Sequence, residues 1–289
     1  MAVLIMASSW TWAAAPAPGI TVFVSVPPQA FLVEKVSGGH VRASVLVGPG
    51  QNPHTYEPTP RQLAALEEAR AFFYTGMPFE APVLHKLSCL GGKIEAIDMR
   101  RGVRPRTLTP DEENADDGGA HGHAKGEPDP HVWLNPRNAS IMAANACEAL
   151  QRLDPAHAAE YAKNLQALQA ELDALDKRLT AELGPFKGTA FYVYHPAFGY
   201  FAEAYGLKER PVEIGGKEPS ARQLAELIDQ AKKEGVRVIF VQPQFSAKSA
   251  ETVADAIGGA VIPMDDLAFD YIANLQHVAD AVRDAMKKK

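Results

Sequence analysis

A single long amphipathic helix constrains the fold of this chain more than any other feature. The segment begins at the start signal Asp154-Pro155 and ends at the stop signal Gly184-Pro185. Within it, apolar side chains recur at spacings of three and four residues, which places them in one stripe along an alanine-rich helix. About thirty residues at about 1.5 Å each make a rod of roughly 45 Å. The stripe consists of Tyr161, Leu165, Leu168, Leu172, Leu175, Leu179 and Leu183.

The regions on both sides of this helix carry the pattern of α/β structure. Each alternates β-rich runs with helical segments, which is typical of a mostly parallel sheet covered by helices. Coiled-coil pairing is the alternative for the long helix, but its place between two alternating regions favours a helix that joins two domains. We therefore predict two Rossmann-like α/β lobes joined by one long rigid helix. The expected ranges are 16–153 for the N-terminal lobe, 154–184 for the linking helix and 185–289 for the C-terminal lobe.

Individual elements follow from the same periodicities and from local start signals. Thr59 before Pro60, and Asn135 before Pro136, each supply a capping side chain and a proline at the first helical position. In the first lobe we expect strands at 20–26, 41–47, 71–74 and 93–97, and helices at 28–36, 60–69, 79–87 and 136–153. In the second lobe we expect strands at 190–194, 211–214, 236–242 and 260–263, and helices at 197–205, 220–234, 247–257 and 269–286.

The composition argues against several classes of protein. With 289 residues and 46% hydrophobic content, the chain has ample material for one large or two medium domains. The formal net charge is -6, and no basic cluster occurs outside Lys287 to Lys289, so nucleic acid is not expected as a partner. Cys89 and Cys147 are too few for a disulfide scaffold, and form either one bridge or two buried thiols.

The N-terminus predicts that the chain is exported. Residues 1–12 are almost wholly apolar, and Ala13-Ala14-Ala15 supplies the small residues that signal peptidase requires, so 1–15 is the expected signal peptide. The basic residues that usually open such a signal are missing, and a disordered or core-packed N-terminus is the alternative. No later run of about eighteen apolar residues follows, so we expect no transmembrane helix.

An acidic segment at 111–129 interrupts the first lobe. It contains Asp, Glu, Gly and His with almost nothing apolar, which predicts a flexible, solvated loop. His121 and His123 lie in this loop. They are either part of a plain linker or an auxiliary pair that captures metal weakly near a tighter site.

Three further histidines stand beside a proline and close to an aromatic residue. Imidazole is a ligand for zinc, copper, iron and nickel, so the repeated pattern indicates a transition-metal site. A lone histidine in a turn is more often a surface or capping residue, and that is our interpretation of the remaining four. The three are His54, His131 and His195, and the four are His40, His85, His157 and His277.

The expected positions of the three histidines allow them to meet in one cleft. His54 and His195 each follow a β-rich run, as do the paired Asp265 and Asp266. Ligands of open α/β sheets bind at the carboxyl ends of strands. If the lobes face each other, His54 and His131 can meet His195 and an aspartate between them. Three imidazoles with a carboxylate or water complete a tetrahedral zinc shell, whereas manganese prefers more oxygen ligands. Copper and nickel also suit this ligand set.

Four segments of the chain resemble a known family. The chain is similar to the zinc-binding members of the periplasmic metal-binding proteins of ABC importers, the ZnuA/TroA-like group. The similarity runs in order over essentially all of Ile20 to Lys289. The segments are Asn52-Pro53-His54-Thr55-Tyr56-Glu57-Pro58-Thr59-Pro60, Asp129-Pro130-His131-Val132-Trp133-Leu134-Asn135-Pro136, Tyr194-His195-Pro196-Ala197-Phe198-Gly199-Tyr200-Phe201 and Glu218-Pro219-Ser220.

The resemblance implies a solute-binding protein that captures Zn(II) as its bound substrate and delivers it to the membrane subunit of an ABC permease. The metal-binding histidines of the family correspond to His54, His131 and His195, and its aspartate ligand corresponds best to Asp265, with Asp266 adjacent. Manganese- and iron-binding relatives tend to carry Glu in place of His195, so zinc is favoured. We expect a monomer without enzymatic activity.

Two departures and two alternatives accompany this interpretation. Some zinc-binding members carry Glu before the first histidine, where this chain has Pro53, which gives more weight to Asp265 or water as the fourth ligand. A zinc-dependent hydrolase could also use three histidines and a bound water, but it would need a general base, and no His-Glu-x-x-His motif occurs. A surface adhesin of the same fold that binds manganese or another metal is the second alternative. The acidic loop is short for this family.

Overall fold

Each half of the chain forms a four-stranded parallel sheet in the computed structural model, which describes residues 19–107, 128–214 and 217–287. The first sheet has the order β2-β1-β3-β4 and the second the order β6-β5-β7-β8. In both, the first strand lies between the second and the third, so the strand order reverses beside it. In open α/β sheets, ligands bind outside the carboxyl ends of the strands at such a point. The strands are β1 (Ile20–Val24), β2 (Val41–Val45), β3 (Ala71–Tyr74), β4 (Glu95–Asp98), β5 (Ala190–Val193), β6 (Lys208–Pro211), β7 (Val238–Val241) and β8 (Ala260–Pro263).

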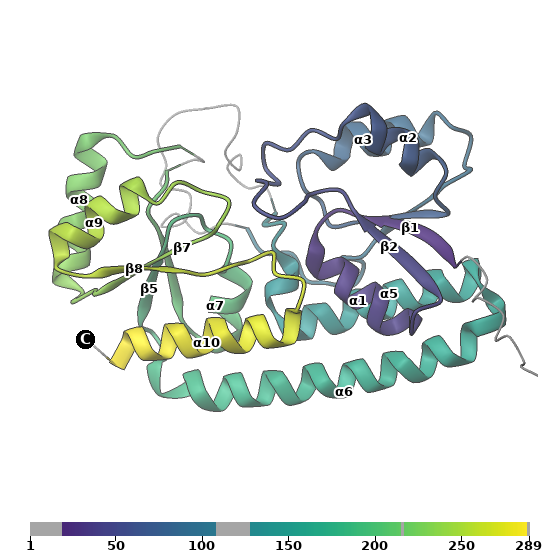
Figure 1. The fold of residues 1–289 in the computed structure, drawn as a ribbon. Helices are drawn as coiled ribbons and strands as arrows, with labels where there is room; N and C mark the ends of the chain where they lie inside the picture. The colour runs from purple at the N-terminus through teal and green to yellow at the C-terminus, as the bar shows by residue number, and fades with distance from the viewer. Residues whose placement is uncertain (1–18, 108–127, 215–216, 288–289) are drawn as a thin grey trace, which may run out of the picture.

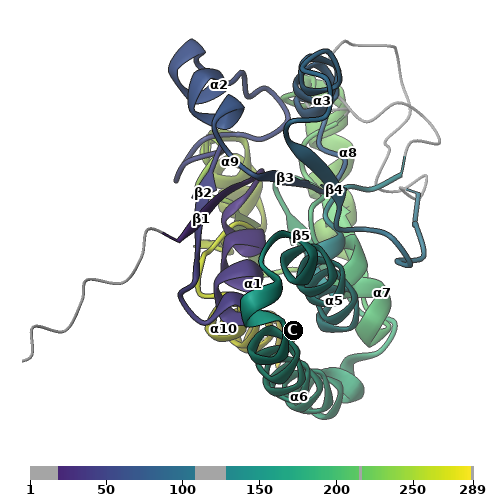
Figure 2. The ribbon, with the colours of Figure 1, turned by 90° about the vertical axis from the view of Figure 1, so that its right-hand side faces the viewer.

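Helices cover both faces of the first sheet. Figure 2 shows α2 and α3 above the strands β1 to β4, and α1 and α5 below them. The Thr59 hydroxyl accepts a hydrogen bond from the backbone N–H of Gln62, and the Gln62 side chain accepts one from the backbone N–H of Thr59, so α2 begins where its capping box is complete. The elements are α1 (Pro27–Ser37), α2 (Pro60–Glu67), α3 (Glu80–Ser88), the 3₁₀ helix η1 (Val132–Leu134) and α5 (Pro136–Leu153).

Helices also cover the second sheet. Figure 1 shows α8 and α9 on its outer side, far from the first lobe, with α7 below the strands. Ser220 and Gln223 repeat the capping box at the start of α8. The elements are α7 (Gly199–Tyr205), α8 (Ala221–Lys233), α9 (Lys248–Ile257) and α10 (Tyr271–Lys287).

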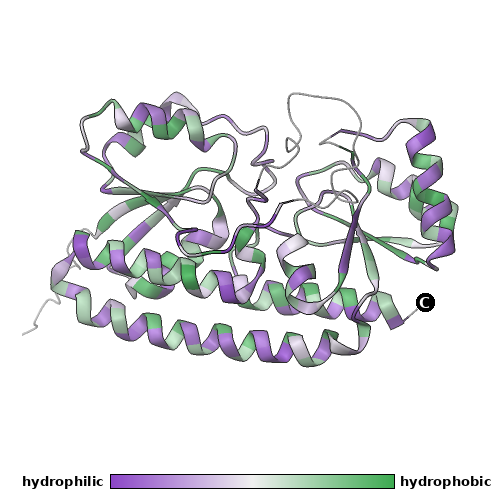
Figure 3. Cartoon of the chain, turned by 180° about the vertical axis from the view of Figure 1, so that it is seen from behind, coloured by the Kyte–Doolittle hydropathy of each residue, from purple (hydrophilic) through white to green (hydrophobic). Residues whose placement is uncertain are grey.

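The expected linking helix is α6 (Ala158–Leu183), which follows the 3₁₀ helix η2 (Pro155–His157) and precedes η3 (Gly184–Phe186). It runs beneath both lobes and contacts α5 of the first and α10 of the second (Figure 1). Hydrophilic and hydrophobic residues alternate along it in Figure 3. Its apolar stripe is buried at Tyr161, Leu168, Leu172, Leu175, Leu179 and Leu183, and Leu165 is partly buried.

One hydrophobic core extends through both lobes. It joins the first sheet, the stripe of α6, the inner face of the second sheet and the buried face of α10. A smaller second core lies between the second sheet and helices α8 and α9. The fold class is therefore as predicted, with two α/β lobes and a long helix between them.

The second of the strands expected in the second lobe lies earlier than predicted. We expected a strand at 211–214, whereas β6 covers Lys208–Pro211 and shares only Pro211 with that range. The run Lys208-Glu209-Arg210 is charged, and charged residues are untypical of a strand, but β6 lies at the sheet edge and alternates between exposed and buried positions. The shift leaves Glu213 just beyond the strand, where it becomes part of the site described below.

Several expectations fall outside the described ranges or concern the cysteines. The signal segment at 1–15 and the loop histidines His121 and His123 lie outside the described residues. Cys89 is exposed and Cys147 is buried, and the two thiols are not bonded to each other. Burial raises the pKa of the Cys147 thiol. Among the helices within the described ranges, none is both long enough and apolar enough to cross a membrane.

Candidate metal centre

His54 lies on the loop that leaves β2. The backbone N–H of His54 donates to the Asn52 side chain at 2.9 Å, which fixes a tight turn before the imidazole. The Tyr56 hydroxyl donates to the backbone carbonyl of Leu46 at 2.6 Å and ties the far side of the loop back to the end of the strand. His54 is half-buried, whereas the other two histidines of the site are buried.

His131 is held in one orientation by a carboxylate. It lies directly before η1 and is completely buried. Asp129 Oδ1 accepts hydrogen bonds from both the backbone N–H of His131, at 2.9 Å, and its ring Nδ1, at 2.8 Å. Because the carboxylate accepts the proton of Nδ1, the lone pair of Nε2 is left to face the other two histidines.

Asp129 is itself paired with an arginine. Arg106 Nη1 lies 2.6 Å from Asp129 Oδ2. Burial alone would raise the pKa of Asp129, but the hydrogen bond and charge of His131, together with the charge of Arg106, outweigh burial and lower it below its ordinary value. The carboxylate that orients His131 therefore stays ionised.

His195 follows β5 and is supported by two side chains of the second lobe. The Gln242 amide accepts from the backbone N–H of His195 at 3.2 Å and donates to its carbonyl at 2.7 Å, so it clamps the backbone. Glu213 Oε1 lies 2.6 Å from His195 Nδ1, which again leaves Nε2 to face the other two histidines. Burial alone would lower the pKa of His195, but the charge and hydrogen bond of Glu213 raise it above its ordinary value.

The three imidazoles converge on one point. The Nε2 atoms of His54 and His131 are 3.2 Å apart, those of His54 and His195 are 3.0 Å apart, and those of His131 and His195 are 3.4 Å apart. A tetrahedral zinc ion with Zn–N bonds of about 2.0–2.1 Å holds its ligand atoms about 3.3 Å from one another. Among the described residues, these three form the group of candidate ligands whose atoms all lie within 4.8 Å of one another.

Two adjacent aspartates lie beside this group and differ in their surroundings. Asp265 Oδ1 accepts from the backbone N–H of Leu267 at 2.8 Å, and Gln244 Nε2 lies 3.5 Å away. Asp266 is buried, and its Oδ1 has no hydrogen-bond partner within the described part of the chain. Burial raises the pKa of Asp266, against the opposing charges of His131 and His195. Asp266 therefore carries an unsatisfied carboxylate oxygen near the imidazoles, whereas Asp265 is engaged in its own turn.

The supporting residues were not singled out from the sequence. Asp129 is part of the quoted Asp-Pro-His segment, and its place two residues before His131 is the signal that could have revealed it. Glu213 falls within the strand expected at 211–214, so the sequence did not indicate that it follows the end of a strand. Arg106 and Gln242 carry no local pattern that indicates a role, because their partners are distant in the sequence.

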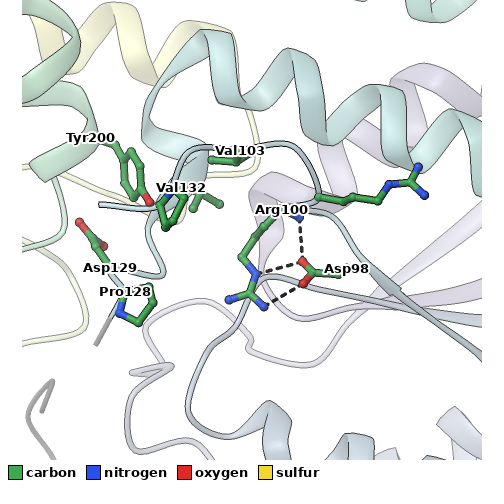
Figure 4. Close-up of a pocket in the computed structure, with 9 residues that line it drawn as sticks. Asp98, Arg100, Val103, Pro128, Asp129, Val132 and Tyr200 are labelled. Atoms are coloured by element: carbon green, nitrogen blue, oxygen red, sulfur yellow. Dashed lines mark hydrogen bonds and ion pairs between the residues drawn. The ribbon is translucent and has the colours of Figure 1, made fainter. Parts of the chain in front are cut away.

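A cavity of about 200 Å³ is lined by Asp129 and by residues that lie before and after it in the chain (Figure 4). Asp98 and Arg100 line it and are joined by two side-chain hydrogen bonds of 2.9 Å each. Tyr200 of α7 lines the same cavity as Asp129, so residues of both halves of the chain meet there. The cavity is separate from the cluster of Nε2 atoms.

The four histidines interpreted as surface or capping residues lie away from the imidazole group. His85 and His277 are exposed. His40 and His157 stack on each other with ring centroids 3.8 Å apart, and each pairs with a carboxylate: His40 with Glu160 at 3.0 Å and His157 with Asp154 at 2.7 Å.

The sequence matches a family model described as zinc-uptake complex component A, periplasmic (ZnuA), over residues 22–285. The high-affinity zinc uptake system protein ZnuA of Bacillus subtilis (strain 168) is 32% identical over 260 residues, which cover 85% of this chain and 81% of the relative. The protein of the same description from Brucella suis biovar 1 (strain 1330) is 28% identical over 313 residues, covering 92% of each.

Solved structures extend this likeness to three dimensions. A crystal structure of ZnuA matches with a TM-score of 0.84 and 39% identity, covering 93% of this chain and 99% of that one. A ZnuA deletion mutant with zinc bound matches with a TM-score of 0.83, also at 39% identity, covering 93% of this chain and 98% of that one.

Proposed function

The chain belongs to the ZnuA family of periplasmic zinc-uptake components, and from this premise we propose that it captures Zn(II) between its lobes and delivers the ion to the membrane permease of an ABC importer. The observation that carries the proposal is the convergence of three Nε2 atoms at the spacing of a tetrahedral zinc shell. The family is periplasmic, and this chain is a periplasmic solute-binding protein of that kind.

In this proposal His54, His131 and His195 each bind zinc through Nε2. The fourth position falls to Asp266 in preference to Asp265, which was the better match by resemblance. The contacts favour Asp266, because its buried Oδ1 has no partner among the described residues, while Asp265 Oδ1 accepts a backbone hydrogen bond. A buried carboxylate gains most from a cation placed beside it.

The ion is cargo in this proposal and does not serve catalysis. A hydrolase needs a metal-bound water together with a general base. The carboxylates of Asp129 and Glu213 are each occupied by an imidazole Nδ1, and Asp266 is assigned to the metal. The ligand set of three imidazoles and one carboxylate also suits zinc better than manganese. We propose that the protein acts as a monomer, since the ligands all come from one chain.

The test is a metal titration of the purified protein with Zn(II), Mn(II), Cu(II) and Ni(II), each against a competing chelator. We expect one tight zinc site and no comparable affinity for manganese. Loss of a residue that supports a metal ligand weakens metal binding by about 10–100-fold. His195→Ala removes a ligand itself, so it should weaken zinc binding by more than this. Asp266→Asn should weaken it clearly more than Asp265→Asn.

His277→Ala is the matched control, because His277 is exposed on α10 and lies outside the imidazole group. Its zinc affinity should equal that of the unaltered protein. Unchanged zinc affinity in His195→Ala would refute the site, and a preference for manganese would refute the substrate. An Asp265→Asn variant weaker than Asp266→Asn would return the fourth position to Asp265.

A further inference from the structure

The Arg106 side chain lies between the two segments that carry His131 and His195. On the side of His131, its Nη1 pairs with Asp129 Oδ2 at 2.6 Å, and its backbone carbonyl accepts from the N–H of Asp129 at 2.9 Å. The Arg106 side chain is only 10% exposed, so this ion pair is shielded from solvent. Arg106 thus holds the carboxylate that in turn holds His131.

On its other side, Arg106 contacts helix α7. Its backbone N–H donates to the hydroxyl of Tyr200 at 3.0 Å, and its guanidinium lies over the Tyr200 ring, 5.7 Å from the centroid. Its Nε is 3.6 Å from Glu203 Oε2. Helix α7 begins at Gly199, four residues after His195, so this helix and His195 form one short continuous segment.

Gly199 makes this approach possible. A Cβ atom added to Gly199 would overlap with Nη1 and the central carbon of the Arg106 guanidinium. The Gly199 backbone does not adopt the left-handed conformation that favours glycine, so the close approach of Arg106 is what requires it. If the arginine were exposed and unpaired, an alanine at position 199 would displace the end of its side chain at little cost. Here the guanidinium is buried and paired with Asp129, so it cannot move without breaking that pair.

We propose that Arg106 is a positioning residue that fixes His131 relative to His195, and that Gly199 serves this role by leaving room for the guanidinium. Arg106 joins the Asp129–His131 pair of the first lobe to the helix that follows His195 in the second. The imidazoles are thereby held at their mutual spacing before zinc arrives, which reduces the ordering that binding must impose. This inference rests on the proposed function of the site.

The experiment is a double-mutant cycle on the full protein with Arg106→Gln, Gly199→Ala and the double variant. Zinc affinity is measured by chelator competition, and the electronic absorption of bound Co(II) reports the geometry of the ligands. We expect each single variant to lose about 10–100-fold in zinc affinity and to alter the Co(II) spectrum. The double variant should be no weaker than Arg106→Gln, because Gly199→Ala acts only by displacing the guanidinium.

Two further variants separate positioning from general damage to the fold. Arg283→Gln removes the ion pairs of a half-buried arginine of α10, with Glu182 of α6 at 3.0 Å and with Asp280 and Asp284 of its own helix, and should leave the zinc affinity and the Co(II) spectrum unchanged. Arg106→Lys keeps a charge beside Asp129 but loses the planar guanidinium over Tyr200, so it should recover part of the affinity. Circular dichroism establishes that each variant is folded.

Additive losses in the cycle would overturn the inference, because Gly199 would then act independently of Arg106. An Arg106→Gln variant with the affinity and Co(II) spectrum of the unaltered protein would also overturn it. An unaltered protein that binds no zinc, or a His195→Ala variant that binds it normally, would instead refute the proposed function. If Arg106→Gln does not fold, Arg106→Lys and Gly199→Ala decide the question through the Co(II) spectrum.

Discussion

Two of the three histidines of the site give one ring nitrogen to a carboxylate. His131 Nδ1 pairs with Asp129 and His195 Nδ1 with Glu213, at 2.8 and 2.6 Å. Each pair fixes the ring so that Nε2 faces the other histidines, and the carboxylate makes that nitrogen a stronger base. His54, in contrast, is half-buried, so it lies on the side of the group that solvent reaches. The two carboxylate–histidine pairs that orient the ligands therefore also affect how strongly protons compete with the metal for Nε2.

As the pH is lowered, zinc affinity should therefore begin to fall at a pH above the ordinary pKa of histidine. Glu213 raises the pKa of His195 despite burial, so in the zinc-free protein a proton occupies Nε2 as the pH falls through a value above about 6.5. The apparent affinity should fall by up to about tenfold per pH unit for each proton that zinc displaces. Zinc titrations at a series of pH values measure this onset.

Glu213→Gln provides the comparison for this pH dependence. Without the carboxylate, the pKa of His195 should fall, so the loss of zinc affinity should begin at a lower pH than in the unaltered protein. At pH 8 the variant should still bind zinc about 10–100-fold more weakly, because His195 Nδ1 has lost its carboxylate partner. Equal onset in both proteins would show that Glu213 does not control the protonation of His195.

At the scale of elements, α6 ties the lobes together through one apolar face. Leu175 and Leu179 on this face are fully buried, and the helix contacts α5 on one side and α10 on the other. Helices of this length gain most of their stability from packing of an amphipathic face. The stripe of α6 is therefore a structural feature shared by both lobes.

Leu175→Ala should destabilise the whole protein by about 2–5 kcal/mol, since it removes a fully buried side chain and leaves a cavity between the helices. Chemical denaturation of the zinc-free protein measures the loss. Lys177→Ala is the control on the same helix, because Lys177 is exposed and pairs with Asp173 one turn away, and the free energy of unfolding should stay within about 0.5 kcal/mol of that of the unaltered protein. Similar losses in both variants would show that α6 is not held by its stripe.

At the scale of the whole molecule, the lobes are joined by more than the linking helix. The Trp133 indole N–H donates to the carbonyl of Asp266 at 2.8 Å, and the Tyr271 hydroxyl donates to the carbonyl of Trp133 at 2.6 Å. Phe31 of α1 also meets Phe269 edge-on, with ring centroids 6.1 Å apart. These contacts, with the shared core, connect the first lobe to the segment that carries the aspartates.

We expect zinc to cause small tilts of the lobes without wide opening. The continuous core and the contacts of Trp133 and Tyr271 would have to break for the lobes to separate. Small-angle X-ray scattering of the zinc-free and zinc-loaded protein should give the same radius of gyration within experimental error. A clear decrease on zinc binding would contradict this expectation and indicate a hinged opening.

The sequence by itself determined the fold class and named the histidines. The stripe of α6 and the alternating pattern around it are local, so they could be recognised without tertiary contacts. The start of α5 at Pro136 and its end at Leu153 were also predicted from local signals. Strand β6 was misplaced, because its charged residues conceal an edge strand.

The tertiary structure alone decided which side chains surround the histidines. The Nε2 spacing, the pairing of Glu213 with His195 and the place of Arg106 against Gly199 depend on segments up to 141 residues apart in the chain. The same holds for the contrast between Asp265 and Asp266, which are neighbours with the same side chain. Only the packing around them buries Asp266 Oδ1 with no hydrogen-bond partner among the described residues, while Asp265 Oδ1 accepts a backbone hydrogen bond in a turn. The local sequence does not indicate that difference.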